Sequence, residues 1–289
     1  MKKLLKLSLI LGFVVMSLNP VQAQVPQEKA LLWEISGNDL KKPSYLFGTI
    51  HMMCTEDFEM PESVKDAVSK SDKLALELDM DDPEIMAKMQ QSSVNPGMQN
   101  IAKNLSEKEV KLLDDYFTSN YGQGIAQIGI LKPFVLSSMV IMKAAACNLV
   151  QYEMEFVKLA QQQEKELIGL ETVEFQMSLF DDLDYQMQID ALVESIEDEE
   201  ETKKLLHLML EAYQSKDIVE LYQQMEEYED IEGFNEKILD ARNINWIPKI
   251  EENSKSASVF YGVGAGHLAG EKGVIALLRE KGYSVKPIN

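Results

Sequence analysis

Residues 257–289 read ASVFYGVGAGHLAGEKGVIALLREKGYSVKPIN. The apolar run at the start predicts a buried strand, residues 271–281 predict a helix, and residues 283–288 predict a last strand. The segment GVGAGH, residues 262–267, holds three glycines and ends in His267, one of only three histidines in the chain. Such a segment can cradle a phosphate, form a tight turn or lead to a functional histidine.

The phosphate interpretation fails on topology. Residues 264–269, GAGHLA, satisfy the dinucleotide fingerprint G-x-G-x-x-A between a strand and a helix. That fingerprint also needs a further strand with an acidic residue about 20 positions on, to bind the ribose. Only one more strand follows, and no acid stands at its tip. We therefore reject a nucleotide site.

A second stretch, YLFGTIH at residues 45–51, repeats the pattern of an apolar run with a histidine three residues after a glycine. A tight turn explains the glycines alone, and a lone His51 would be read as an ordinary strand-end histidine. Taken together, Gly48-x-x-His51 and Gly264-x-x-His267 place two imidazoles at strand ends. If the two strands are neighbours, both histidines emerge at one edge of the sheet, where ligands gather in α/β folds.

The apolar patterning predicts strands near both ends of the chain and helices between them. Strands are expected at 31–35, 44–50, 73–79, 166–171, 257–264 and 283–288, and helices across 82–163 and 172–253. We predict a mixed α/β (α+β) fold in which N- and C-terminal segments build a central sheet that carries a large, mostly helical lobe. One domain is expected over 24–289, with its sheet core at about 30–80, 165–172 and 255–289.

Residues 1–23 have the form of a secretory signal peptide. Two lysines precede a short apolar run, and Val21-Gln22-Ala23 resembles a cleavage site. The run is too short to span a bilayer, which takes about 20 residues. We expect an exported protein, periplasmic or extracellular, with no stable membrane span.

The formal net charge of −20 argues against nucleic acid as a partner, because phosphate binding needs clustered Lys and Arg. The composition does not predict an oligomeric state. An even number of cysteines in an exported chain favours a disulfide between Cys54 and Cys147, with two buried free thiols as the alternative.

Two glutamates accompany the histidines. Glu77 interrupts the apolar run LALELD, and Glu171 ends LIGLE. A carboxylate in a buried strand is costly unless it is paired or coordinated. Two histidines and a carboxylate are the usual ligands of a catalytic divalent metal. The sequence has no HExxH helix and no G-x-S-x-G elbow, and His207 reads as an ordinary helix residue.

At these residues the chain resembles the TraB/PrgY/GumN family, to which the Tiki metalloproteases are related. The resemblance covers most of the chain from residue 32 to 288. It rests on five segments in the family's order: GTIH (48–51), ALELD (75–79), GLETVEFQ (169–176), LDARNINWIPKIEE (239–252) and GAGHLAGEKGVIALLREKGYSVKPI (264–288). It implies a mixed α/β fold, related in shape to erythromycin-esterase-like and ChaN-like proteins, in which both G-x-x-H motifs converge.

The Tiki branch implies divalent-metal-dependent peptide cleavage, whereas other branches look like binders or inhibitors of peptide pheromones. The residues carried over are His51, Glu77, Glu171, Arg242, Asn243 and His267. Of these, His51, Glu77 and His267 are expected to hold a divalent metal, Zn, Mn or Co.

We therefore expect an exported metal-dependent hydrolase, most readily a peptidase. Glu171 is a candidate base or an orienter of another group, and Arg242 is a candidate clamp for a substrate carboxylate or an acidic ligand. The alternative is a protein that only binds a peptide or small ligand in the same cleft. Esterase activity rests on fold analogy alone.

Overall fold

The computed structural model describes residues 25–227 and 233–288. Its centre is a six-stranded sheet in the order β6-β4-β7-β2-β1-β8. The strands are β1 (Leu32–Ser36), β2 (Ser44–Thr49), β4 (Lys73–Leu76), β6 (Leu167–Gly169), β7 (Val259–Gly264) and β8 (Ser284–Ile288). The mixed α/β fold and the origin of the sheet in both ends of the chain are confirmed. The predicted signal peptide, 1–23, lies outside the described residues.

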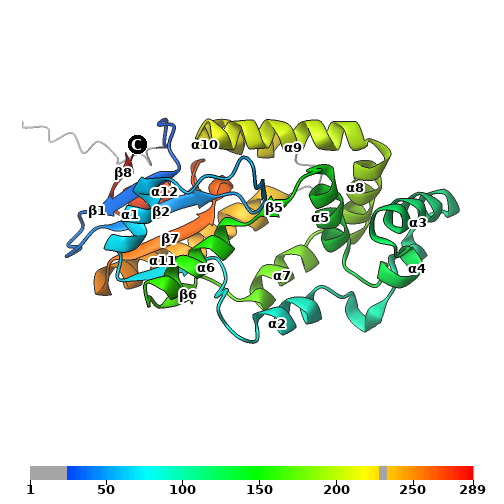
Figure 1. Cartoon of the computed structure of the whole chain (residues 1–289), viewed down its shortest axis with the longest axis horizontal. Coiled ribbons are helices and arrows are strands. Elements are labelled where there is room, and N and C mark those ends of the chain that lie inside the picture. Colours follow the sequence, from blue (N-terminus) through cyan, green and yellow to red (C-terminus); the bar gives the residue numbers. More distant parts are fainter. Residues whose placement is uncertain (1–24, 228–232, 289) are drawn as a thin grey trace, which may run out of the picture.

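Strands β6, β4, β7 and β2 run parallel, and β1 pairs antiparallel with β2 and β8. Strand β7 separates β2 from β4, so the two glycine–histidine motifs lie on adjacent strands (Figure 1). Strand β4 ends at Leu76, earlier than the 73–79 expected from sequence. Glu77 therefore stands at the end of the strand instead of within it.

Both faces of the sheet are covered by helices, which explains why its central strands are continuous apolar runs. On β7, Tyr261 joins one core with α11 (Ala241–Ser256) and α12 (Val274–Glu280), whereas Phe260 joins the opposite core with α1 (Glu62–Lys70) and α6 (Tyr152–Gln162). Helix α12 is shorter than the 271–281 expected from sequence.

The remaining helices form a lobe beside the sheet (Figure 1). They are α2 (Ile85–Ser92), α3 (Glu107–Tyr121), α4 (Ile125–Ile128), α5 (Pro133–Ala144), α7 (Val173–Asp181), α8 (Tyr185–Glu197) and α9 (Glu199–Gln214), and they are followed by α10 (Ile218–Glu227), which packs against the sheet cores. Helices α3, α4, α5 and α8 share a separate apolar core around Phe117 and Leu192. Helices α9 and α10 then lead back from the lobe to the sheet (Figure 1). Within the described ranges, no helix is both long and apolar enough to cross a membrane.

A small ribbon joins the lobe to the first histidine motif. Strand β3 (Met53–Cys54) pairs antiparallel with β5 (Leu149–Val150), and neither strand was predicted from sequence. The Cys54–Cys147 disulfide lies at this ribbon, so the predicted bond is confirmed.

Candidate functional site

The carboxyl ends of the parallel strands bring the predicted site residues to one edge of the sheet. His51 follows β2, Glu77 follows β4, Glu171 follows β6, and His267 ends a short 3-10 helix, η4 (Ala265–His267), directly after β7. Register places Thr49 beside Gly264, so the two motifs run side by side. The expected convergence of the two histidines is observed.

Gly264 marks the centre of this convergence. A Cβ atom built on Gly264 would lie 3.4 Å from Oε1 of Glu77, 3.5 Å from Cδ2 of His267 and 3.7 Å from Nε2 of His51. Its backbone N–H also donates to Oε1 of Glu77 across 2.8 Å. Glycine here leaves open the space that the three side chains surround.

Gly48 serves a different purpose. A Cβ atom at Gly48 would lie 2.8 Å from Cδ1 of Leu268 and 3.0 Å from Cα of Ala265. The backbone of the first motif therefore packs directly on the second, which a side chain would prevent. Glycine is therefore suited to the two positions for different physical reasons: close backbone packing at Gly48 and open space at Gly264.

His267 is buried and held in one tautomer. Its Nδ1 lies 2.7 Å from Oδ1 of Asn243, and its Nε2 lies 3.0 Å from Nη1 of Arg242. Since a guanidinium only donates, Nε2 accepts and Nδ1–H donates to Asn243. Burial, together with the charge of Arg242, lowers the pKa of His267 to about 3, so the ring is neutral.

Glu77 is also buried, but it is ionised. Burial alone would raise its pKa, yet the charge of Arg242, with smaller contributions from both histidines, holds the pKa well below its usual range. Nη2 of Arg242 donates to Oε2 of Glu77 across 2.5 Å, and Nε2 of Gln176 on α7 donates to the same oxygen across 3.2 Å. These contacts leave Oε1 turned toward Gly264 and His267.

Glu171 lies behind Glu77, where α11 engages both of its oxygens. Arg242 donates to Oε1 from Nη2 across 2.5 Å and from Nε across 3.0 Å, and Trp246 donates to Oε2 across 3.1 Å. Arg242 and Trp246 are one turn apart on α11, so a single helix face supplies both donors. Burial raises the pKa of Glu171, although Arg242 opposes this.

His51 occupies the open side of the site. Its Nδ1 lies 3.1 Å from Oε1 of Glu153, at the start of α6, and the hydroxyl of Thr49 donates to the same oxygen across 2.8 Å. Desolvation lowers the pKa of His51, but the hydrogen bond to Glu153 and the charge of Glu77 outweigh it and raise the pKa to about 9. Water reaches 63% of this side chain and screens these charges.

The donor set fits a divalent metal in the type of its ligand atoms. Both histidines are held through Nδ1 by an oxygen acceptor, which is how metal-binding imidazoles are usually oriented. However, in the part of the chain that the structure describes, no three imidazole, carboxylate or thiol groups form a ready-made metal cluster. Nε2 of His267 lies 3.8 Å from Oε1 of Glu77 and is engaged by Arg242. Arg242 must release this nitrogen before it can bind a metal.

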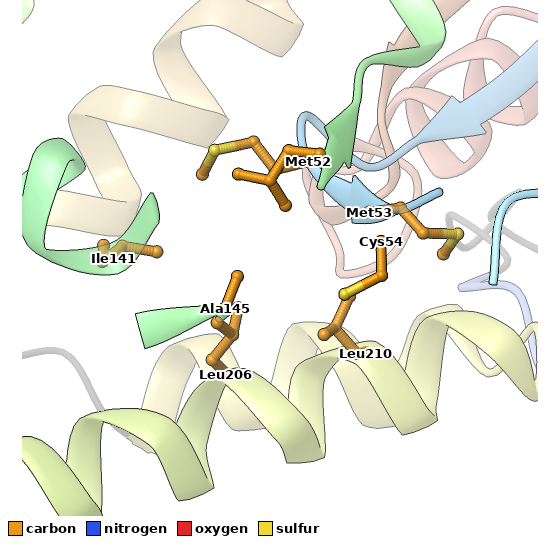
Figure 2. A pocket seen from close by; sticks show the side chains of 8 residues that line it. Met52, Met53, Cys54, Ile141, Ala145, Leu206 and Leu210 are labelled. Carbon is orange, nitrogen blue, oxygen red and sulfur yellow. The ribbon is translucent and has the colours of Figure 1, made fainter. Parts of the chain in front are cut away.

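A small apolar recess lies beside the first motif. Figure 2 shows it between the loop that follows His51, the end of α5 and one face of α9. Its walls are entirely apolar or sulfur-bearing: Met52, Met53, Cys54, Ile141, Ala145, Leu149, Leu206 and Leu210. Ile141 remains 38% exposed.

The arrangement of the two motifs matches what the resemblance implied. Comparison with family models then establishes the family to which the chain belongs. A model of the TraB/PrgY/gumN family matches residues 31–287. The chain belongs to the TraB/PrgY/gumN family. No curated protein and no solved structure matches it. The family match covers both G-x-x-H motifs, the glutamates after β4 and β6, and the Arg242-Asn243 pair on α11.

All six residues carried over from this TraB/PrgY/gumN resemblance lie at one sheet edge, whereas His207 lies exposed on α9 beside Glu211. Sequence reasoning missed Glu153, Gln176 and Trp246. Gln176 and Trp246 stand inside quoted family segments and could have been found there. Glu153 follows the unpredicted ribbon within a helix of ordinary composition, and no local signal marks it.

Proposed function

We propose that this protein is a metal-dependent hydrolase in which His51, Glu77 and His267 hold a divalent metal. The observation that carries the proposal is the convergence of His51 Nε2, Glu77 Oε1 and the His267 ring around Gly264. A divalent metal bound by such ligands supplies Lewis-acid activation of water or of a carbonyl group. Two nitrogens and a carboxylate suit Zn, Mn or Co.

The other residues orient these three. Asn243 holds Nδ1 of His267, and Arg242 aligns Glu77 while keeping it ionised. Glu171 is not available as a base, because Arg242 and Trp246 engage both of its oxygens. We therefore propose that Glu171 holds Arg242 in position. In this proposal, proton transfer is carried out by a different group, nearer the open side of the site.

A peptide is the proposed substrate. An extended peptide bound across His51 would pass the apolar recess, whose lining would contact an apolar side chain of the peptide. Incubating the protein with a peptide library and each divalent metal tests this directly. New peptide termini that depend on His51, and that favour apolar residues near the cut, are expected.

A second candidate is a binding protein without turnover. The observation that favours it is the hydrogen bond between Arg242 and Nε2 of His267, which already occupies one proposed ligand atom. In that case the same peptides bind stoichiometrically and no new termini form with Zn, Mn or Co.

A further inference from the structure

We infer that Glu153 is a positioning residue for His51, and that the disulfide-linked ribbon β3–β5 exists in part to place it there. Glu153 lies in the first turn of α6, which packs against one face of the sheet, whereas His51 follows β2, 102 residues earlier in the chain. This inference rests on the proposed function, because it concerns how the proposed metal ligand His51 is held in position.

The contacts specify the orientation of the ring. Oε1 of Glu153 receives the hydroxyl of Thr49 at 2.8 Å and Nδ1 of His51 at 3.1 Å. An ionised carboxylate only accepts hydrogen bonds, so Nδ1 carries the proton. Nε2 then points toward Gly264, 3.7 Å from the position of a Cβ atom there. Glu153 thus does for His51 what Asn243 does for His267.

An exposed ion pair of this kind contributes little free energy to holding its two side chains in place. His51 is 63% exposed, and pairs near water contribute little once side-chain entropy and screening are counted. The backbone must therefore bring the two residues together. His51 stands two residues before β3, and Glu153 stands three residues after β5.

The ribbon supplies that backbone restraint. Met53 pairs with Val150 and Cys54 pairs with Leu149, and both the backbone N–H and the hydroxyl of Thr55 donate to the carbonyl of Asn148. The Cys54–Cys147 bond closes the same unit covalently. With only two residues in each strand, the ribbon is marginal on its own, so the disulfide adds to the packing of α6 on the sheet in keeping Glu153 in register with His51.

The test combines Zn²⁺ affinity, measured by competition with a chromogenic chelator, with detection of the His51 ring Nδ1–H by NMR in metal-free protein. The ring signal is assigned by its loss in His51→Gln. For Glu153→Ala we expect loss of this signal through rapid exchange with water, and about a 10- to 100-fold loss of Zn²⁺ affinity. Glu153→Gln keeps an acceptor oxygen and should retain the signal.

Glu155→Ala is the matched control, because Glu155 lies in the same first turn of α6 but pairs with Lys158 on the surface. It should leave both readouts unchanged. Cys54→Ser combined with Cys147→Ser should weaken the ring signal without altering any of the proposed metal ligands. An unchanged ring signal in Glu153→Ala, or equal effects of Glu153→Ala and Glu155→Ala, would overturn the inference. If the unaltered protein binds no Zn²⁺, the proposed metal function fails, yet the ring signal still decides the role of Glu153.

Discussion

Nη1 of Arg242 donates a hydrogen bond to Nε2 of His267 across 3.0 Å, while Nη2 of the same guanidinium contacts both Glu77 and Glu171. One buried cation therefore organises a neutral imidazole and two buried carboxylates. Because burying unpaired charge is costly, the network depends on this single side chain. The surplus of carboxylate over guanidinium charge also makes the site receptive to a further cation.

Removing Arg242 should destabilise the fold. Arg242→Met leaves Glu77 and Glu171 buried without their partner, and we expect a loss of about 3–5 kcal/mol in the free energy of unfolding. Urea unfolding of metal-free protein measures this. Lys203→Met, which removes a cation paired only on the surface, should change stability by less than about 0.5 kcal/mol. A loss below about 1 kcal/mol for Arg242→Met would mean that the network contributes little.

His267 should make the protein acid-sensitive. Its pKa is about 3 in the folded state against 6.5 ordinarily, so the unfolded chain binds the extra proton and stability falls as pH drops below 6.5. At about pH 4.5 this amounts to about 3 kcal/mol. Glu171, whose pKa burial raises, acts with the opposite sign. The measurement is therefore the difference between wild type and His267→Gln, in chelator, across this range.

His267→Gln should flatten the acid limb of the stability profile between pH 6.5 and about 4.5. His51 does not interfere there. Its raised pKa adds stability that is present below pH 6.5 and is lost only as pH rises toward about 9. Parallel profiles for the two proteins would show that folding leaves the pKa of His267 near its ordinary value.

The two motif glycines should respond differently to alanine. Gly48→Ala forces a methyl group against Leu268 and Ala265, and overpacking of this kind costs about 1–3 kcal/mol. Gly264→Ala meets only ordinary contacts of 3.4–3.7 Å, so the fold should tolerate it while the new methyl group fills the space between the donor atoms. Urea unfolding and Zn²⁺ titration of both variants check this. The opposite pattern, an unstable Gly264→Ala that still binds Zn²⁺, would contradict it.

The disulfide should stabilise the whole chain. Cys54 and Cys147 are 93 residues apart, and in the chain-entropy model closing such a loop contributes about 4–5 kcal/mol. Reduction should lower the Tm by roughly 10 °C. Calorimetry with and without reductant measures this, and alkylation under denaturing conditions without reductant should label neither cysteine. Labelling of both would show that the bond is absent in the protein.

Much of the fold could be predicted because its strands are short apolar runs bounded by turns. The segments 44–50 and 257–264 became β2 and β7 nearly as expected, and the matching motifs suggested that they are neighbours. The parallel pairing and the insertion of β7 between β2 and β4 depend on long-range packing, which no local pattern encodes.

The candidate site also contains some residues that the sequence indicates and others that it does not. His51, Glu77 and His267 were found because polar residues at the ends of apolar strands are conspicuous. Glu153 was not found, because it is a glutamate in the first turn of a helix, where acidic residues are common. Its partner is set by a ribbon of two-residue strands, too short for hydrophobic periodicity to indicate.

The most direct test of the metal proposal is a Zn²⁺ titration of chelator-treated protein, with Mn²⁺ and Co²⁺ in parallel, by isothermal calorimetry. The proposal predicts a single ion per chain, with affinity sharply reduced in His51→Ala, Glu77→Gln and His267→Ala. His207→Ala, which removes the exposed histidine of α9, should bind as wild type does. Equal affinity in the wild type, His51→Ala and His267→Ala, or no binding of any of the three metals, would contradict it.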